Sequence, residues 1–179
     1  MLAPVEIAGV ASCVPAIVVT NHELEKLVDT SDEWISKRTG IKKRRIAVTE
    51  TAVGMAAQAA AEALEMSGVG KDDIGLIVGC TVSGDNLTPA MASSVQRALG
   101  IERCAAMDIS AGCTGFVYAL VTAASLMDTL GAGSALVVAS ETLSKYVDWT
   151  DRATCVLFGD GAGAVVLKRS DKPRMHYPM

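Results

Sequence analysis

Short apolar runs alternate along this chain with longer segments whose apolar positions repeat every three or four residues. The runs predict buried strands, because a strand covered on both faces reads as continuous hydrophobic sequence. Four such runs are residues 5–14, 74–80, 104–109 and 134–140. The longer segments predict helices: residues 55–66 are rich in alanine and end before Gly68, and residues 89–99 have a proline near the first turn. Strands that alternate with helices predict an α/β sheet.

Two short amphipathic helices are expected between the first strand and residue 55. Asn21 is a favourable N-cap residue for the first of them. The second begins near residues 31–33 and ends at Gly40, because glycine is typical of helix C-termini.

A glycine-rich segment interrupts the last part of the predicted sheet. Residues 154–158 and 162–167 read as two strands, which Gly159, Asp160 and Gly161 join in a turn. The sequence Gly-Asp-Gly-Ala-Gly also resembles a nucleotide-binding loop, but such a loop leads from a strand into a helix. Because residues of strand type follow it here, we interpret it as a turn.

One stretch of the sequence, residues 109–127, carries no charge over nineteen positions, and a cysteine lies near its start. Cys113 has small neighbours, Ala-Gly before it and Thr-Gly after it. It follows the strand predicted at residues 104–109, and no glycine or proline interrupts residues 116–130, which predicts a helix. This strand-turn-helix pattern places Cys113 at a helix N-terminus.

Cys113 is therefore our candidate nucleophile. Sulfur reacts as the thiolate, and the unpaired N–H groups and positive dipole end of a helix N-terminus favour an anion. The same N–H groups can hold the oxyanion of a thioester under attack. Spacing alone leaves open the alternative of a buried, small hydrophobic residue. The two histidines, His22 and His176, have no spacing that suggests a metal ligand or a general base.

The helix predicted at residues 116–130 is apolar or neutral on every face, which is typical of a helix buried on all sides. A single sheet covers only one face, so we expect a second domain or a partner chain to cover the other. A membrane span is the alternative for an uncharged run of this length. Three features argue against a membrane span: the run contains hydroxyl side chains, it contains two glycines, and acidic rather than basic residues flank it.

Composition narrows the class of protein. With 179 residues, the chain can form one domain with its own core. Its net charge of -4 argues against nucleic-acid binding. Five cysteines without a C-x-x-C pair fit neither a disulfide framework nor a zinc site. Since the N-terminus also lacks the pattern of a secretory signal, we expect a cytoplasmic protein without a bound metal.

Basic residues gather locally in this acidic chain, at Lys37, Arg38 and positions 42–45. A solvated loop is the ordinary interpretation of such a cluster, and phosphate recognition is the sharper one. Trp34 lies four residues before Arg38, so on a helix both side chains share a face, where they can bind a phosphorylated ring ligand. A tryptophan of the hydrophobic core is the alternative.

Three separated motifs are more specific than any of these features alone. The first, at residues 29–41, contains Asp-Thr-Ser-Asp-Glu-Trp-Ile and Arg-Thr-Gly-Ile. The second, at residues 110–116, is Ser-Ala-Gly-Cys-Thr-Gly-Phe, and the third, at residues 150–164, contains Thr-Asp-Arg and Phe-Gly-Asp-Gly-Ala-Gly-Ala. In this order and spacing they resemble the β-ketoacyl-acyl carrier protein synthase III family of type II fatty-acid synthesis. The resemblance extends from about Val5 to Leu167.

The resemblance implies a thiolase-like α/β fold, in which two similar halves stack in αβαβα layers around two central nucleophile helices. This chain would form one half, with a mixed, mostly parallel sheet. We expect an N-terminal half-domain at residues 1–168 and a disordered tail at residues 169–179, with the C-terminal half absent.

The implied activity is that of a condensing acyltransferase. Cys113 matches the family's acylated cysteine, which takes the acyl group from acyl-CoA and passes it to malonyl-acyl carrier protein with loss of CO₂. Trp34 and Arg152 match the pair that sandwiches the CoA adenine, and Thr30 and Arg38 match nearby CoA contacts. Acyl-CoA would be a substrate, so no cofactor is expected.

The resemblance also implies an acyl pocket and a homodimer of the full-length enzyme. Leu143 and Phe158 match residues that line the pocket. Thr88 matches a position supplied across the dimer interface, where some members carry an aromatic side chain. The smaller threonine suggests a pocket open to longer or branched acyl primers.

No residue of this chain matches the histidine and asparagine with which the family binds the malonyl thioester and promotes decarboxylation. We therefore expect acylation of Cys113 without condensation. Two other classes remain open: a non-catalytic dimerisation partner that retains the half-fold, and an α/β-hydrolase-like thiol esterase. In the esterase, Ala111 and Gly115 would flank the cysteine of a nucleophile elbow, but a later Asp and His in suitable context are missing.

Overall fold

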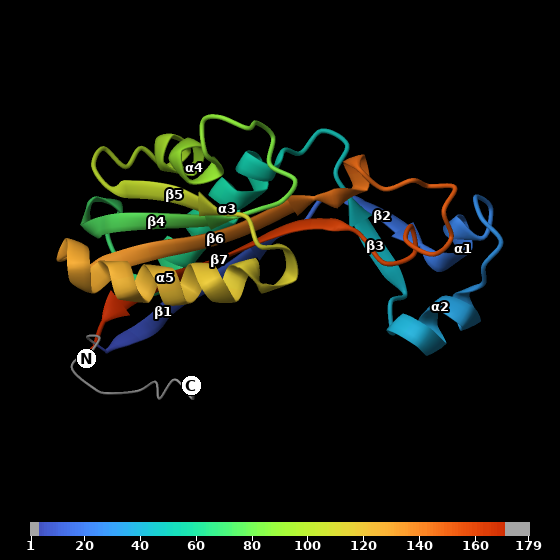
Figure 1. Cartoon of the computed structure of the whole chain (residues 1–179), viewed down its shortest axis with the longest axis horizontal. Helices are drawn as coiled ribbons and strands as arrows, with labels where there is room; N and C mark the ends of the chain where they lie inside the picture. The colour runs from blue at the N-terminus through green and yellow to red at the C-terminus, as the bar shows by residue number, and fades with distance from the viewer. Residues whose placement is uncertain (1–3, 171–179) are drawn as a thin grey trace.

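A five-stranded sheet forms the framework of the structure, a computed structural model that describes residues 4–170 (Figure 1). The strand order across the sheet is β1-β7-β6-β4-β5. The strands are β1 (Val5–Cys13), β4 (Ile74–Cys80), β5 (Ala105–Ile109), β6 (Ser134–Thr142) and β7 (Asp160–Arg169).

Strand directions agree with the alternation of strands and helices in the sequence. β4 pairs in parallel with both β5 and β6, whereas β7 pairs antiparallel with both β6 and β1. Only β7 therefore runs against the other strands of this sheet. The predicted mixed, mostly parallel sheet is confirmed.

Helices cover both faces of the sheet. On one face lie α3 (Ala52–Ser67) and α4 (Met91–Leu99), and on the other lies α5 (Gly115–Leu130). Alternate strand residues divide between these layers, as the two-residue period of a strand requires. Ile77 and Leu136 pack toward α3 and α4, while Leu76 and Val137 pack toward α5.

Small side chains let α3 lie close to the sheet. Its alanines at positions 56, 59, 60 and 63 are completely buried. Opposite them, a Cβ at Gly9 of β1 would lie 2.2 Å from the carbonyl oxygen of Ala63, so only glycine fits there. The alanine-rich composition that predicts a helix therefore also sets its distance from the strand.

A small lobe projects from one end of the sheet, at the right in Figure 1. We define it as residues 17–46 together with residues 146–158. It contains an antiparallel pair, β2 (Ile17–Thr20) and β3 (Lys43–Ile46), and two helices, α1 (Asn21–Leu24) and α2 (Asp32–Thr39). Its own core consists of four buried residues: Leu24, Ile35, Cys155 and Val156.

Three details of this lobe correct the sequence analysis. The N-cap of α1 is Thr20, in a capping box with Glu23, and Asn21 instead is buried within the lobe. The strands β2 and β3 were not predicted. The basic positions 43–45 form β3 rather than a solvated loop, and Arg44 is buried.

The predicted closing strand pair is wrong. Residues 154–157 form turns, and Asp160 and Gly161 begin β7 instead of joining two strands. The buried Asp160 carboxylate accepts hydrogen bonds from Ala47 N at 2.6 Å, Ser144 N at 2.9 Å and Ser144 Oγ at 2.5 Å. The glycine-rich motif thus surrounds a carboxylate that ties three segments together.

Three short 3-10 helices complete the described secondary structure: η1 (Lys71–Asp73), η2 (Gly112–Thr114) and η3 (Leu143–Lys145). At the C-terminal end, β7 extends through Arg169, and Ser170 N donates to Pro4 O at 2.9 Å. Positions 169 and 170 therefore belong to the fold and not to a tail. The remainder of the expected tail, residues 171–179 with His176, lies outside the described residues.

Candidate functional site

Cys113 lies in the tight turn between β5 and α5. Figure 1 shows the start of α5 at the end of the sheet that faces the small lobe. The turn is the 3-10 helix η2, and α5 begins only at Gly115. Cys113 is therefore two residues before the α-helix, not in its first turn. Its side chain is exposed, so the alternative of a buried hydrophobic residue is wrong.

Glycines on both sides of Cys113 shape this turn. Gly112 has a φ of +54°, a left-handed conformation that favours glycine. A Cβ at Gly115 would lie 2.3 Å from Cys80 Sγ at the end of β4. Close packing of the helix start on β4 therefore leaves the thiol of Cys113 at the surface of the sheet's end.

The other four cysteines are less accessible. Cys80 and Cys155 are buried, and Cys13 and Cys104 are half-buried. Burial raises the pKa of each of these four thiols above 9.0, because a desolvated thiolate is disfavoured. Cys113 is therefore the one exposed thiol among the described residues.

Trp34 on α2 is in contact with two guanidinium groups. The Cζ of Arg38, one helical turn later, lies 4.3 Å from the centroid of the Trp34 ring, as the four-residue spacing predicts. The Cζ of Arg152, from a distant part of the chain, lies 4.9 Å from the same centroid. We call these three residues the Trp34 cluster. An aromatic ring with two cations can stack on a flat ring ligand and pair with its phosphates.

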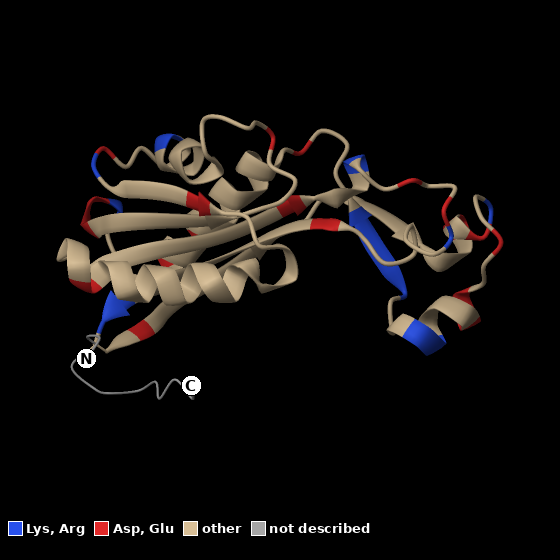
Figure 2. Ribbon diagram, in the orientation of Figure 1, with Lys and Arg blue, Asp and Glu red and all other residues tan. Residues whose placement is uncertain are grey.

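The Trp34 cluster has two further polar neighbours in sequence. Arg152 Nη1 forms an exposed ion pair with Asp29 Oδ2 at 3.4 Å. Thr30 Oγ1 is buried and has no hydrogen-bond partner in the structure. Figure 2 shows basic residues on α2 and along β3, whereas α5 carries charge only near its C-terminal end. Eight of the sixteen Lys and Arg residues of the chain therefore lie in the small lobe, together with seven Asp and Glu residues.

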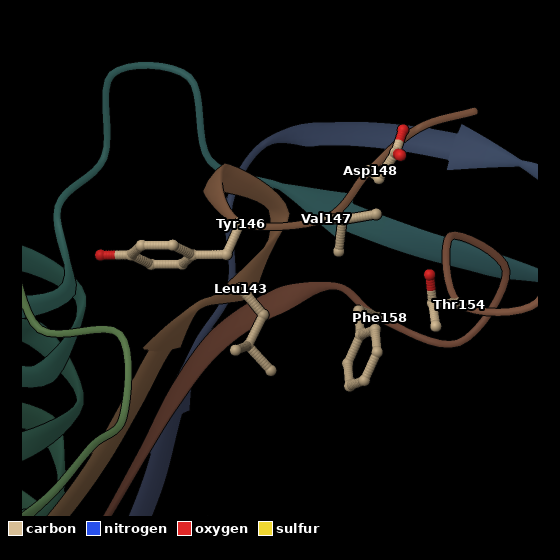
Figure 3. A pocket seen from close by; sticks show the side chains of 6 residues that line it. All are labelled: Leu143, Tyr146, Val147, Asp148, Thr154 and Phe158. Atoms are coloured by element: carbon tan, nitrogen blue, oxygen red, sulfur yellow. The ribbon is translucent and has the colours of Figure 1, made fainter. Parts of the chain in front are cut away.

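A cavity of about 310 Å³ opens beside the segment that follows β6 (Figure 3). Leu143 and Phe158, the predicted acyl-pocket residues, both line it. Its other lining residues are Tyr146, Val147, Asp148 and Thr154. Apolar side chains from two chain segments thus form one concave surface, which suits an aliphatic group.

A neighbouring cavity of about 410 Å³ lies along the connection between β4 and α4. Leu87, Asp108 and Ser110 are among its lining residues. Tyr146 lines both cavities, so it forms a shared wall that the sequence analysis missed. Its position three residues after Leu143 was the available signal in the sequence. Thr88 lines neither cavity but lies exposed on the same connection.

One face of α5 is apolar and uncovered. Ala119, Ala123 and Met127 pack on the sheet, while Val117 is 56% and Tyr118 53% exposed. Among the described residues, the stretch Gly112–Leu130 is long and apolar enough to cross a membrane by length and composition alone. Its packing against β4 and β6 is that of a core helix with one layer of cover missing.

Metal-binding groups do not gather at this site. Within residues 4–170, no three His, Cys, Asp or Glu side chains lie close enough together to hold a metal ion.

Comparisons with known proteins repeatedly find synthases of one name. A family profile for 3-oxoacyl-[acyl-carrier-protein (ACP)] synthase III matches residues 107–177. A β-ketoacyl-[acyl-carrier-protein] synthase III from Thioalkalivibrio sulfidiphilus is 54% identical over 167 residues, which are 93% of this chain and 52% of that enzyme. The enzyme of the same name from Clostridium acetobutylicum is 50% identical, over 94% of this chain and 52% of its own length.

Solved structures show the same likeness in three dimensions. The 3-oxoacyl-[acyl-carrier-protein] synthase III of Aquifex aeolicus superposes with a TM-score of 0.91 at 49% identity, over 94% of this chain and 55% of that chain. The priming β-ketosynthase of the R1128 polyketide pathway gives a TM-score of 0.92 at 39% identity, over 96% of this chain and 52% of its own. This chain thus spans about half the length of the relatives it matches.

Proposed function

We propose that this chain carries the acylation machinery of a condensing acyltransferase of fatty-acid synthesis. The premise is that it corresponds to half of a thiolase-like β-ketoacyl-[acyl-carrier-protein] synthase III. The acyl donor is acyl-CoA and the nucleophile is Cys113. The observation that carries this proposal is the Trp34 cluster, in which α2 and residue 152 bring an aromatic ring and two guanidinium groups together. That chemistry fits the adenine and phosphates of CoA.

The proposed reaction begins when the Cys113 sulfur attacks the thioester carbonyl of acyl-CoA. The new carbon–sulfur bond forms as the bond to the CoA sulfur breaks, and the proton of the Cys113 thiol ends on the released CoA. Exposure of Cys113 at the sheet end gives the thioester access to sulfur. Thr30 matches a CoA contact of the family, and we propose that its buried hydroxyl, which has no hydrogen-bond partner among the described residues, has that role here.

The acyl chain would occupy the cavity lined by Leu143 and Phe158. Thr88, exposed on the connection after β4, fits a role at the interface of a homodimer. A threonine in place of an aromatic side chain leaves more room, so we propose that longer or branched primers are accepted. Competition between acetyl-CoA and branched acyl-CoAs for Cys113 tests this, and strict preference for acetyl-CoA would contradict it.

Condensation needs groups beyond those described here. In that step malonyl-acyl carrier protein loses CO₂, its carbanion attacks the acyl-Cys113 thioester, and Cys113 leaves as thiolate. Since this chain spans about half of its relatives and has no match for their histidine and asparagine, we propose that it undergoes acylation alone. The proposal includes a cytoplasmic location and no bound cofactor, membrane or nucleic acid.

Mass spectrometry of the chain after incubation with acyl-CoA tests the acylation step. We expect one acyl group per chain on Cys113, none on Cys113→Ala, and no β-ketoacyl product when malonyl-acyl carrier protein is added. A chain that folds but is never acylated, while Cys113 alkylates no faster than the other thiols, would favour the non-catalytic dimerisation partner instead.

A further inference from the structure

Arg44 on β3 is a buried cation of the small lobe, with only 5% of its surface exposed. Its Nη1 donates to Val19 O at 3.2 Å, and its Nη2 donates to Asn21 Oδ1 at 2.7 Å and to Val156 O at 3.3 Å. Desolvation lowers its pKa from 12.5, because burial disfavours the charged form. A buried guanidinium that is held by neutral oxygens needs an explanation, since burying a charge is costly.

Asn21 extends the reach of Arg44 to α2. Its Oδ1 accepts from Arg44, while its Nδ2 donates to Asp32 Oδ1 at 2.8 Å and to Ile41 O at 2.7 Å. Arg44 offers only donors and Ile41 O only accepts, so these partners fix the orientation of the amide. Asp32 lies in the first turn of α2, two residues before Trp34. Arg44 is thus connected to α2 through one amide.

Arg44 also holds the segment on the other side of the Trp34 cluster. Val156, whose carbonyl accepts from Arg44, lies between Arg152 of the cluster and Phe158 of the cavity. The chain continues close by, since a Cβ at Gly159 would lie 3.0 Å from Arg44 Cβ. The Arg44 guanidinium therefore bonds directly to the segment that carries Arg152, and through the Asn21 amide to α2, which carries the rest of the Trp34 cluster.

We propose that Arg44 and Asn21 are positioning residues that set the spacing between α2 and the segment 151–158, and thereby the width of the slot for the nucleotide end of CoA. The proposal rests on the proposed function. We expect neither residue to touch the ligand, because both side chains are buried and bond to protein groups through Arg44 Nη1 and Nη2 and through both polar atoms of the Asn21 amide. The Nε of Arg44 is buried without a hydrogen-bond partner among the described residues. Loss of the connection is expected to weaken nucleotide binding without changing the chemistry at Cys113.

Two substitutions break the connection at different points. Asn21→Asp keeps an acceptor for Arg44 but loses the amide donor and places a carboxylate against Asp32, which repels α2. Arg44→Lys keeps the charge, but one ammonium cannot reproduce the fork that reaches Val19, Asn21 and Val156 together.

Arg45→Met is the matched control. Arg45 neighbours Arg44 on the same strand, and its Nη1 donates to Pro15 O at 3.1 Å and Ala16 O at 3.3 Å. The control therefore removes a comparable set of hydrogen bonds without touching either segment of the Trp34 cluster. Circular dichroism and thermal unfolding identify any variant that fails to fold.

The experiment compares two properties of the 179-residue chain. Calorimetric titration with CoA reports nucleotide binding, and the rate of Cys113 acylation by an acyl-pantetheine, which lacks the nucleotide, reports the chemistry. We expect Asn21→Asp and Arg44→Lys each to raise the Kd for CoA about tenfold or more. A change of this size is what the loss of one charge-assisted or buried hydrogen bond costs. Acylation by acyl-pantetheine should stay within about twofold of wild type, because the rate of that step depends on Cys113.

The outcomes separate the two proposals. If the wild type binds CoA and folded Asn21→Asp and Arg44→Lys bind it equally well, the positioning role is refuted and the proposed function stands. Equal losses with CoA and acyl-pantetheine, or with Arg45→Met, would also refute it, because they indicate a general structural defect. If the wild type neither binds CoA nor is acylated, the proposed function fails and the positioning role fails with it.

Discussion

At the scale of single residues, carboxylates distant in sequence hold the backbone of this protein together. Asp85 accepts from Ala52 N and Val53 N at the start of α3, at 3.0 and 2.8 Å. Asp108 accepts from Met91 N and Ala92 N at 2.5 and 2.8 Å, and so caps α4, whose own N-cap residue provides no side-chain bond. Acidic residues thus satisfy helix N–H groups that otherwise lack partners.

The carboxylate of Glu50 makes the stability of the folded protein depend on pH. Its carboxylate accepts from the backbone of Ala16 at 3.1 Å, and of Val48 and Thr49 at 3.2 Å, which holds its pKa at about 2, below the ordinary 4.5. A lowered pKa in the folded state contributes stability that is complete above pH 4.5 and is lost as the pH falls toward 2.

We therefore expect the stability advantage of wild type over Glu50→Gln to shrink between pH 5 and pH 2. Urea unfolding at several pH values measures it, with Glu65→Gln on the surface of α3 as the control. An advantage that stays constant over this range would contradict the assignment.

The five thiols should differ in their rates of alkylation. At pH 7.5 we expect iodoacetamide to label Cys113 well before the other four cysteines, because Cys113 is exposed and the pKa values of Cys13, Cys80, Cys104 and Cys155 are raised by burial. Peptide mass spectrometry over time reads the order, and labelling in denaturant provides the intrinsic rates. Similar rates at all five thiols in the folded chain would exclude selective activation.

Residue types predicted part of the site. Cys113 and the pair Trp34 and Arg38 follow from small neighbours and from helical spacing, which are local properties of the sequence. Arg44 and Asn21 could not be found this way. Val156, one partner of Arg44, lies 112 positions away, and nothing in the sequence distinguishes Arg44 from the basic residues on either side of it.

At the scale of elements, the attachment of α5 to β4 decides how Cys113 is presented. Gly115→Ala would place a methyl group 2.3 Å from Cys80 Sγ, so the helix start must move. We expect a loss of about 1–3 kcal/mol in the free energy of unfolding, the usual effect of overpacking.

A double-mutant cycle identifies the clash. Cys80→Ala removes the sulfur, so it should recover much of the stability that Gly115→Ala loses, as measured by urea unfolding. Purely additive losses of stability in the double variant would show that the added methyl group does not clash with Cys80.

The difference between local sequence patterns and long-range contacts explains which elements the sequence predicted. β4 and β6 are continuous apolar runs, and α3 has a strong alanine pattern, so their local sequence is sufficient. The strands β2 and β3 have four residues each and pair with each other across the small lobe, with exposed and basic positions that carry no strand period. Their formation depends on tertiary contacts such as those of Arg44.

At the scale of the whole molecule, one face of α5 is apolar and exposed. Val117, Tyr118 and Val121 are 56%, 53% and 41% exposed on a helix whose opposite face packs on the sheet. From the sequence we expect a second domain or a partner chain to cover that face.

We expect the isolated chain to self-associate through this face. Val117→Asp combined with Val121→Asp should lower its apparent mass in analytical ultracentrifugation with little change in thermal stability, because both side chains are already exposed. Val48→Asp, at a site 73% exposed and far from α5 in the sequence, is the control. Unchanged association in the double variant would place the contact elsewhere.

The position of β7 between β1 and β6 has a consequence for synthesis of the protein on the ribosome. β1 is made before the other described strands, yet its partner in the sheet is β7, with Val5 opposite Arg169. The N-terminal strand must therefore wait, unpaired, until nearly the whole described chain has left the exit tunnel. Closing so long a loop late favours slow folding. In the cell, the nascent chain should depend on chaperones that shield an exposed strand during translation.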